Sequence, residues 1–278
     1  MTLHRPETLD AALALLAEGG GVVLAGGTDV YPGLRDAPAP ARMIDVSAVS
    51  GLRGITRDGD HWRIGAATTW TDVVRADLPA LFDGLKLAAR EVGSVQIQNT
   101  GTVAGNLCNA SPAADGVPAL LALDAEVELT GPDGARRVPL GAFIQGIRKV
   151  DLGPAELMTA IYVPDAPGCG AFRKLGARRY LVISIAMVGA VVHAEGGRIV
   201  RAHIAVGSCS PVARRLVALE TALVGAALGD VGGIVGQARL DELTPIDDVR
   251  ASAAYRMDAV RTLVRRTVLD AVEKTDVA

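Results

Sequence analysis

The sequence has few of the residues that hold metals or iron–sulfur clusters. Its 3 cysteines, Cys108, Cys169 and Cys209, lie far apart and form no CxxC or CxxxxC pair. Clusters are held by closely spaced cysteine thiolates, so we expect none in this chain. The 4 histidines show no HxxxH pair and no pairing with cysteine, and therefore no metal site is expected. A small, odd set of cysteines is typical of a reducing compartment.

Aromatic residues and excess positive charge are also scarce. Aromatics make up 3% of the chain, and the formal net charge is −3. Nucleic-acid-binding domains usually carry a basic surface or stacking aromatics, so no nucleic-acid partner is expected. No stretch of 18 residues is both uncharged and predominantly apolar, which argues against a membrane span, and the N-terminus lacks a charged-then-apolar signal segment. The expected location is the cytoplasm.

Half of the residues are hydrophobic, which is enough for a packed core filled by Leu, Val, Ile and Ala. Strands and helices alternate irregularly before Pro164 to Gly168, which is the best linker candidate, and a sheet followed by helices comes after it. We therefore predict an α+β protein with two domains. The apolar patterns and turn residues predict helices near 8–18, 69–74, 81–88, 118–123, 212–224, 230–240 and 250–274, strands at 22–25, 42–46 and 157–163, and hairpins turning near 58–60, 131–134 and 195–197.

The first motif with chemical content follows the strand at 22–25. Two adjacent glycines, Gly26 and Gly27, allow close backbone approach, and successive N–H groups in such a turn can bind a phosphate. A strand that ends in two glycines is, however, more often a plain turn. The GxGxxG dinucleotide fingerprint is not met. The full motif is Leu24, Ala25, Gly26, Gly27, Thr28, Asp29 and Val30.

The second motif spans Gln96 to Asp115 within a polar segment, 93–115, that has little periodicity and is predicted as a long loop. Long ordered loops are usually functional. Its small donors and acceptors would suit a polar ligand with many acceptors, whereas a solvated surface loop is the alternative, and the residue chemistry leaves both open. Those polar residues are Thr102, Asn106, Asn109, Ser111 and Asp115, with Gly101 and Gly105 between them.

The third motif is the basic run Phe172 to Arg179. A solvated strand and turn at the domain junction is the simpler interpretation. The alternative is that this run provides a cation beside an electron-rich or anionic cofactor.

Together the three motifs resemble the FAD-binding (medium) subunit of the xanthine dehydrogenase and carbon-monoxide dehydrogenase family, the molybdenum hydroxylases. The family pattern AGGT[DH], then QIRNxGTxGGNxxxxSPxxD, then a lysine-containing strand, corresponds to Ala25–Asp29, Gln96–Asp115 and Lys174. Order and spacing agree over essentially the whole chain. Two positions depart from it: Ala104 replaces a glycine, which phosphate binding should tolerate if its φ is negative, and Gln98 replaces an arginine.

The resemblance implies a two-lobed FAD-binding domain of the vanillyl-alcohol oxidase and p-cresol methylhydroxylase type at 1–167, with lobes of about 1–50 and 51–167, and a C-terminal α+β domain at 168–278. Residues Leu24 to Val30 would hold one side of the FAD diphosphate. Residues Thr102 to Asn106, which include Val103 and Ala104, would hold the other side of the diphosphate and the ribityl chain. Asp115 would bind the ribityl or adenine-side hydroxyls, and Lys174 would lie near the isoalloxazine. Gly93 and Met158 also match family contacts. No catalytic side chain is implied.

The resemblance also implies partners. A large subunit would carry the molybdenum cofactor, a small subunit two [2Fe–2S] clusters, and FAD would deliver electrons to an acceptor such as NAD or a quinone. Two alternatives remain: an assembly subunit that has lost FAD, and a self-contained flavin oxidase, against which the short C-terminal region argues. A hydrolase around Ser208 to Ser210 lacks the GxSxG elbow.

Overall fold

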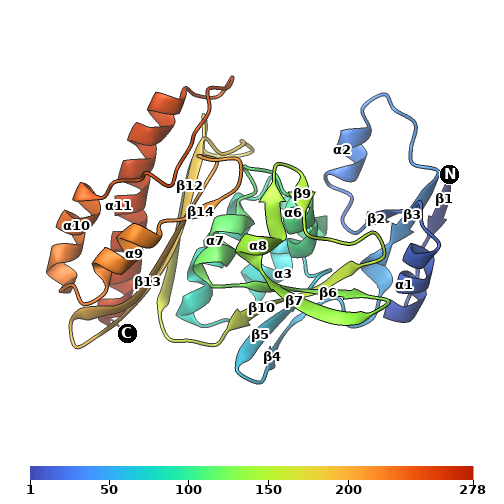
Figure 1. The fold of residues 1–278 in the computed structure, drawn as a ribbon, viewed down its shortest axis with the longest axis horizontal. Helices are drawn as coiled ribbons and strands as arrows, with labels where there is room; N and C mark the ends of the chain where they lie inside the picture. Colours follow the sequence, from blue (N-terminus) through green and yellow to red (C-terminus); the bar gives the residue numbers. More distant parts are fainter. Residues whose placement is uncertain (278) are drawn as a thin grey trace.

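The computed structural model describes residues 1–277, and the chain forms three main sheets with helices around them (Figure 1). Helices and strands mix without a repeated βαβ unit, so the α+β class predicted from the sequence is confirmed. Within the described part of the chain, no helix is both long and apolar enough to cross a membrane.

The N-terminal sheet is small and parallel, with strand order β1-β3-β2. Helix α1 (Leu9–Ala17) packs against it through Ala12 and Leu16, and Thr8 caps the helix by accepting a hydrogen bond from the Ala11 N–H at 3.2 Å. The helix agrees with the one predicted near 8–18. The strands are β1 (Thr2–His4), β2 (Val22–Leu24) and β3 (Arg42–Asp45), and the short helices α2 (Val30–Leu34) and η1 (Val46–Ala48) flank β3 in the chain.

The second sheet is antiparallel, with strand order β4-β5-β10-β6-β7. Its inner face and the helices above it enclose the central core, which includes Trp70, Phe82, Leu120 and Ile161. The strands are β4 (Ile55–Asp58), β5 (His61–Gly65), β6 (Glu126–Gly131), β7 (Gly134–Pro139) and β10 (Leu157–Pro164); the other elements are α3 (Trp70–Arg75), η2 (Ala80–Phe82), α4 (Asp83–Glu91), α5 (Val95–Thr100), α6 (Val103–Asn109), α7 (Gly116–Ala122), α8 (Leu140–Phe143), β8 (Ile144–Gly146) and β9 (Lys149–Val150).

The prediction of a long loop at 93–115 is wrong in one respect, because this segment contains the helices α5 and α6. Each helix begins with a capping side chain: Ser94 accepts from the Ile97 N–H at 3.3 Å, and Thr102 accepts from the Gly105 N–H at 3.0 Å. The sequence did not predict either helix, because both are short and begin with polar capping residues. A helix can be recognised from the spacing of its apolar residues only when that spacing repeats over a longer run.

The C-terminal sheet, with strand order β11-β12-β13-β14, is covered on both faces (Figure 1). On one face Val188, Ala190 and Val192 pack against the C-terminal helices. On the other, Met187 and Val191 join the central core, so one hydrophobic core extends across both domains. The elements are β11 (Cys169–Leu175), β12 (Ala186–Glu195), β13 (Arg198–Gly207), β14 (Arg214–Arg215), α9 (Val217–Leu223), η3 (Leu228–Asp230), α10 (Val231–Gln237) and α11 (Ala253–Val277). The helix predicted at 212–224 begins only at Val217, because Arg214 and Arg215 form β14.

Helix α7 is the element that joins the two domains. All seven of its residues are buried, and it packs on β12 and β13 of the C-terminal sheet. Gly189 on β12 makes this contact possible, because a Cβ there would lie 2.7 Å from the Pro118 carbonyl oxygen. Glycine is required at Gly189 because the backbones of α7 and β12 lie in direct contact.

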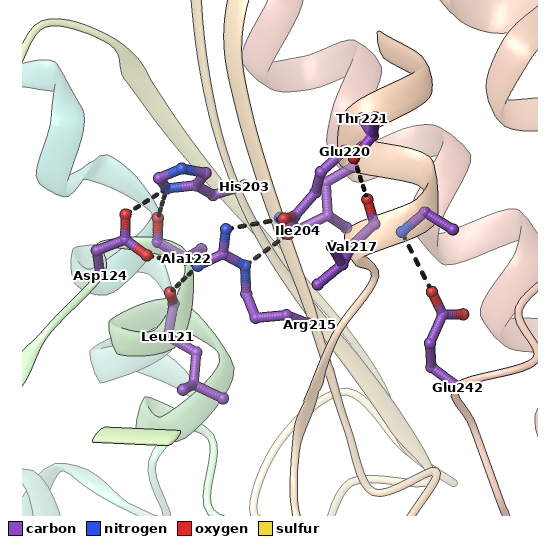
Figure 2. Close-up of polar contacts among 11 residues, drawn as sticks. Leu121, Ala122, Asp124, His203, Ile204, Arg215, Val217, Glu220, Thr221 and Glu242 are labelled. Atoms are coloured by element: carbon purple, nitrogen blue, oxygen red, sulfur yellow. Dashed lines mark hydrogen bonds and ion pairs between the residues drawn. The ribbon is translucent and has the colours of Figure 1, made fainter. Parts of the chain in front are cut away.

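A polar cluster fixes the C-terminal end of α7 to the C-terminal sheet (Figure 2). Arg215 donates from Nη1 to Asp124 Oδ1 at 2.5 Å and from Nη2 to Glu220 Oε2 at 2.8 Å. His203 Nδ1 lies 3.1 Å from the Ala122 carbonyl oxygen and 3.2 Å from Asp124 Oδ2. Since both neighbours are acceptors, Nδ1 carries the proton. The cluster thus connects β13, β14 and α9 to the turn after α7.

Acidification should weaken this cluster. Burial lowers the pKa of His203, Arg215 lowers it further, and Asp124 and Glu220 oppose them. The folded state then binds fewer protons than the unfolded state, so stability falls as the pH drops below the unfolded histidine pKa of about 6.5. We expect the free energy of unfolding to fall less for His203→Gln than for wild type between about pH 7 and about pH 5. Equal slopes in urea unfolding would contradict this.

Candidate functional site

Two glycine-containing turns that are far apart in the sequence meet in the structure. A Cβ on Gly26 would lie 1.9 Å from the Thr100 carbonyl oxygen and 2.9 Å from the Gly101 Cα. A Cβ on Gly101 would lie 3.3 Å from Thr28 Oγ1. The turn after β2 and the α5–α6 connection therefore touch backbone to backbone, and the predicted convergence of the two motifs is confirmed.

The first turn offers unused backbone donors. Among the described residues, the N–H groups of Gly26, Gly27, Thr28 and Asp29 make no hydrogen bond to another residue. Gly27 has φ +69°, and the Tyr31 ring lies where its Cβ would be, so glycine is required there on two grounds. Successive N–H groups in a turn of this kind form an anion-binding concavity. Leu24, before the turn, is buried and anchors it.

The second turn adds further donors at the start of α6. Within the described chain, the N–H groups of Thr102 and Ala104 also have no hydrogen-bond partner, whereas the Val103 N–H donates to the Thr68 carbonyl at 2.9 Å. Ala104 lies inside α6, so its φ is negative and its methyl group leaves the turn unchanged. Alanine in place of the family's glycine at Ala104 therefore meets the stated requirement of a negative φ. Gln98 donates instead to the Arg90 carbonyl at 3.0 Å.

Asn106 provides an unsatisfied acceptor in the same region. Its Oδ1 is buried and has no hydrogen-bond partner among the described residues. A Cβ on Gly116 would lie 3.2 Å from this oxygen, which places Asn106 at the start of α7. A buried acceptor without a donor is rare in folded proteins and indicates a missing ligand or water.

Asp115 and Lys174 form a buried ion pair with each other. Lys174 Nζ lies 2.8 Å from Asp115 Oδ2 and 3.1 Å from the Glu91 carbonyl oxygen, and the two side chains are 5% and 9% exposed. Ser184 donates to Asp115 Oδ1 at 2.6 Å. Burial raises the pKa of the Asp115 carboxyl, while the Lys174 ammonium and the Ser184 hydroxyl stabilise its charged form. The sequence did not suggest this pairing, because each residue was assigned to a different part of the cofactor.

The remaining predicted residues lie at varying distances from this region. Asn109 Oδ1 accepts from Arg148, and Ser111 Oγ accepts from the Ala113 N–H at 3.3 Å, so both are already bonded within the chain. Gly93 has φ +52° and faces Ile97. Met158 is 2% exposed and part of the central core. Their roles at a cofactor stay predictions.

The structure also shows a cavity of about 290 Å³ between the two domains, which the sequence did not reveal. Ser111 and Ser184 line it from the side of the ion pair, and Arg148 and Arg256 line it elsewhere. Two of its lining residues have left-handed backbones, Ser208 at φ 62° and Arg148 at φ 55°. Such strain is most common at functional sites, and no sequence signal marks either residue.

Comparisons with known proteins identify the family of this chain. The family described as "FAD binding domain in molybdopterin dehydrogenase" matches residues 1–166, and "CO dehydrogenase flavoprotein C-terminal domain" matches residues 171–271. The fold and the site thus define an FAD-binding oxidoreductase subunit. More specifically, the chain belongs to the family of FAD-binding medium subunits of xanthine and carbon monoxide dehydrogenases.

Individual relatives cover nearly the whole chain. The xanthine dehydrogenase FAD-binding subunit of Escherichia coli O157:H7 is 32% identical over 97% of this chain and 95% of its own length. The carbon monoxide dehydrogenase medium chain of Afipia carboxidovorans is 33% identical, over 95% and 94%. Among solved structures, reconstituted CO dehydrogenase from Oligotropha carboxidovorans superposes with a TM-score of 0.88 at 29% identity, covering 98% of each chain.

The residues present fit FAD. The unused N–H groups of the two turns match the acceptor oxygens of a diphosphate, and Gly26 leaves no side chain between them. Asn106 Oδ1 is an acceptor without a donor, and the hydroxyl groups of the ribityl chain could donate to it.

Proposed function

We propose that this chain is the electron-transfer subunit of a molybdenum hydroxylase complex. It would receive electrons from the [2Fe–2S] clusters of a small subunit and pass them to an external acceptor such as NAD or a quinone. The large subunit, with the molybdenum cofactor, would transform the organic substrate. The observation that carries the proposal is the contact between the two glycine turns, because only their convergence brings the unused N–H groups to one diphosphate.

The residues of this chain would bind and orient the cofactor rather than react with substrate. FAD supplies the redox chemistry when bound, and the protein sets its position and electrostatics. We assign the diphosphate to Leu24–Val30 and Thr102–Asn106, and the region beyond it to Asp115 and Lys174. Because Asp115 offsets the charge of Lys174, the pair adds no net charge near the cofactor while both are ionised.

We further propose the boundaries 1–167 and 168–278 for the two domains, since the third sheet begins at β11.

The cavity lined by Ser111 and Ser184 is our candidate for the approach of the electron acceptor, because it opens next to the buried ion pair of Asp115 and Lys174. A cytoplasmic location is also proposed, and the three cysteines, which are free thiols, support it. An assembly subunit without FAD is less consistent with the intact glycine turns.

Co-purification tests this proposal. A tagged chain expressed in its native host should carry along a large and a small subunit, and the complex should show the visible absorbance of oxidised flavin. Substrate added without an acceptor should bleach that absorbance. A complex that lacks flavin, or a chain that purifies alone and oxidises a substrate itself, would contradict the proposal.

Asn106 should contribute measurably to cofactor affinity. Asn106→Ala removes the buried Oδ1 acceptor, and if a flavin hydroxyl pairs with it, that hydroxyl is left without a partner. We expect FAD binding to weaken by about 1–3 kcal/mol, measured by titrating the flavin-free subunit. Asn99→Ala is the matched control, because Asn99 is exposed and bonds only Thr71. Equal affinities for both variants would argue against the Asn106 assignment.

A further inference from the structure

We propose that Arg215 is a positioning residue for the flavin site, acting from the C-terminal domain through α7. The inference rests on the proposed function, because its effect is partly measured on bound FAD. It assigns a role to the polar cluster of Figure 2, which lies at the opposite end of α7 from Asp115.

Arg215 satisfies groups at the C-terminal end of α7. Its Nη1 donates to the Leu121 carbonyl at 3.1 Å and to Asp124 Oδ1 at 2.5 Å. The last carbonyls of a helix have no partner within the helix. The Leu121 carbonyl already accepts from the Asp124 N–H at 3.1 Å, so Arg215 adds a second bond that ties this turn to the C-terminal domain. Asp124 also has a left-handed backbone, φ 52°, a conformation that aspartate adopts more readily than most non-glycine residues.

Arg215 is itself held by the C-terminal domain. Glu220 on α9 accepts from Nε at 2.5 Å and from Nη2 at 2.8 Å, and its Oε1 also accepts from the Ile204 N–H on β13 at 2.7 Å. The side chains of Arg215 and Glu220 are 22% and 9% exposed. A two-point contact of this kind fixes direction as well as distance, so the guanidinium is a rigid support for the helix end.

Helix α7 can transmit this support to the flavin site. It has seven residues, so its ends are about 10 Å apart and are joined by one hydrogen-bonded backbone. Asp115 precedes its first residue and is bonded to Lys174 and Ser184. Gly116, the first residue, lies against Trp70 and Asn106 Oδ1. Release of the C-terminal end would therefore loosen Asp115 and the surroundings of Asn106 together.

The test compares three substitutions in the full-length subunit and its complex. Arg215→Met keeps the length of the side chain but removes its charge and all of its hydrogen bonds. Arg215→Lys keeps the charge without the two-point contact to Glu220. Arg239→Met is the matched control, because Arg239 lies in the same domain, is 86% exposed and pairs only with Asp241.

The first measurement is hydrogen exchange of the α7 amides in flavin-free protein. We expect Arg215→Met to exchange about tenfold faster than wild type, Arg215→Lys to lie between them, and the control to match wild type. The second is FAD affinity, which should weaken about tenfold in Arg215→Met. The visible flavin spectrum and midpoint potential should shift in the same order, which a general loss of stability would not produce.

The inference is overturned if Arg215→Met leaves the α7 exchange rates, the FAD affinity and the flavin spectrum unchanged, or if only the melting temperature falls. If Arg215→Met fails to fold, Arg215→Lys and Glu220→Gln decide by the same measurements. The proposed function fails separately, if the wild-type subunit binds no FAD. If the wild-type subunit binds FAD and Arg215→Met binds it equally well with unchanged α7 exchange, only this inference is rejected and the proposed function stands.

Discussion

Gly26→Val should purify with less than about a tenth of the wild-type FAD, which corresponds to at least about 1.4 kcal/mol of lost binding free energy. The added Cβ would lie 1.9 Å from the Thr100 carbonyl oxygen, a main-chain atom that cannot rotate away. The two turns must then separate, and the N–H groups of Gly26 and Thr102 would no longer both reach the diphosphate that we assign to them. Flavin released by denaturation, measured per polypeptide, checks this expectation.

Gly33→Val is the matched control, because Gly33 is in the neighbouring helix α2 and has nothing within 4 Å of its Cβ position. It should retain FAD at the wild-type stoichiometry. Circular dichroism and melting temperature separate loss of the site from loss of the fold. A Gly26→Val protein with full flavin content would show that the turns do not hold the diphosphate.

Lys174→Met should cost about 3–5 kcal/mol of folding stability, because it leaves the Asp115 carboxylate buried without its cation. The loss should shrink as the pH falls, since burial raises the pKa of Asp115 and the protonated carboxyl carries no charge. Urea unfolding of the flavin-free subunit measures the effect.

The double substitution Asp115→Asn with Lys174→Met provides the comparison for this prediction. It removes both charges, so much of the stability should return. Lys149→Met serves as the exposed control, since Lys149 has no ion pair among the described residues. A single variant at Lys174 that unfolds within about 1 kcal/mol of wild type would contradict a buried, mutually dependent pair.

Much of the fold could be predicted because apolar periodicity and turn residues are local signals. The helices predicted near 8–18 and 69–74 and the hairpin predicted near 58–60 all occur in the structure. The helices α5 and α6 were not predicted, because each is about two turns long or less and rich in polar residues. Strand β14, of two residues, exists only through pairing with β13, which no local pattern encodes.

The candidate site shows the same division. The glycine turns were found because glycine next to a strand end is itself a signal, and their contact followed from the family resemblance. The pairing of Asp115 with Lys174 could not be read from residues 59 positions apart. The strained Ser208 and Arg148 lacked any signal, because left-handed backbones outside glycine are imposed by tertiary packing.

The position of α7 has a practical consequence for dissecting the molecule. By chain order α7 precedes the 164–168 linker, but its buried residues pack on β12 and β13 and share one core with them. A truncated protein that stops at the linker would expose Pro118 and Ala119, which lie against Gly189, and a fragment that starts there would leave Gly189 uncovered. Expression boundaries that follow the spatial contacts must therefore keep α7 and the C-terminal sheet in one polypeptide.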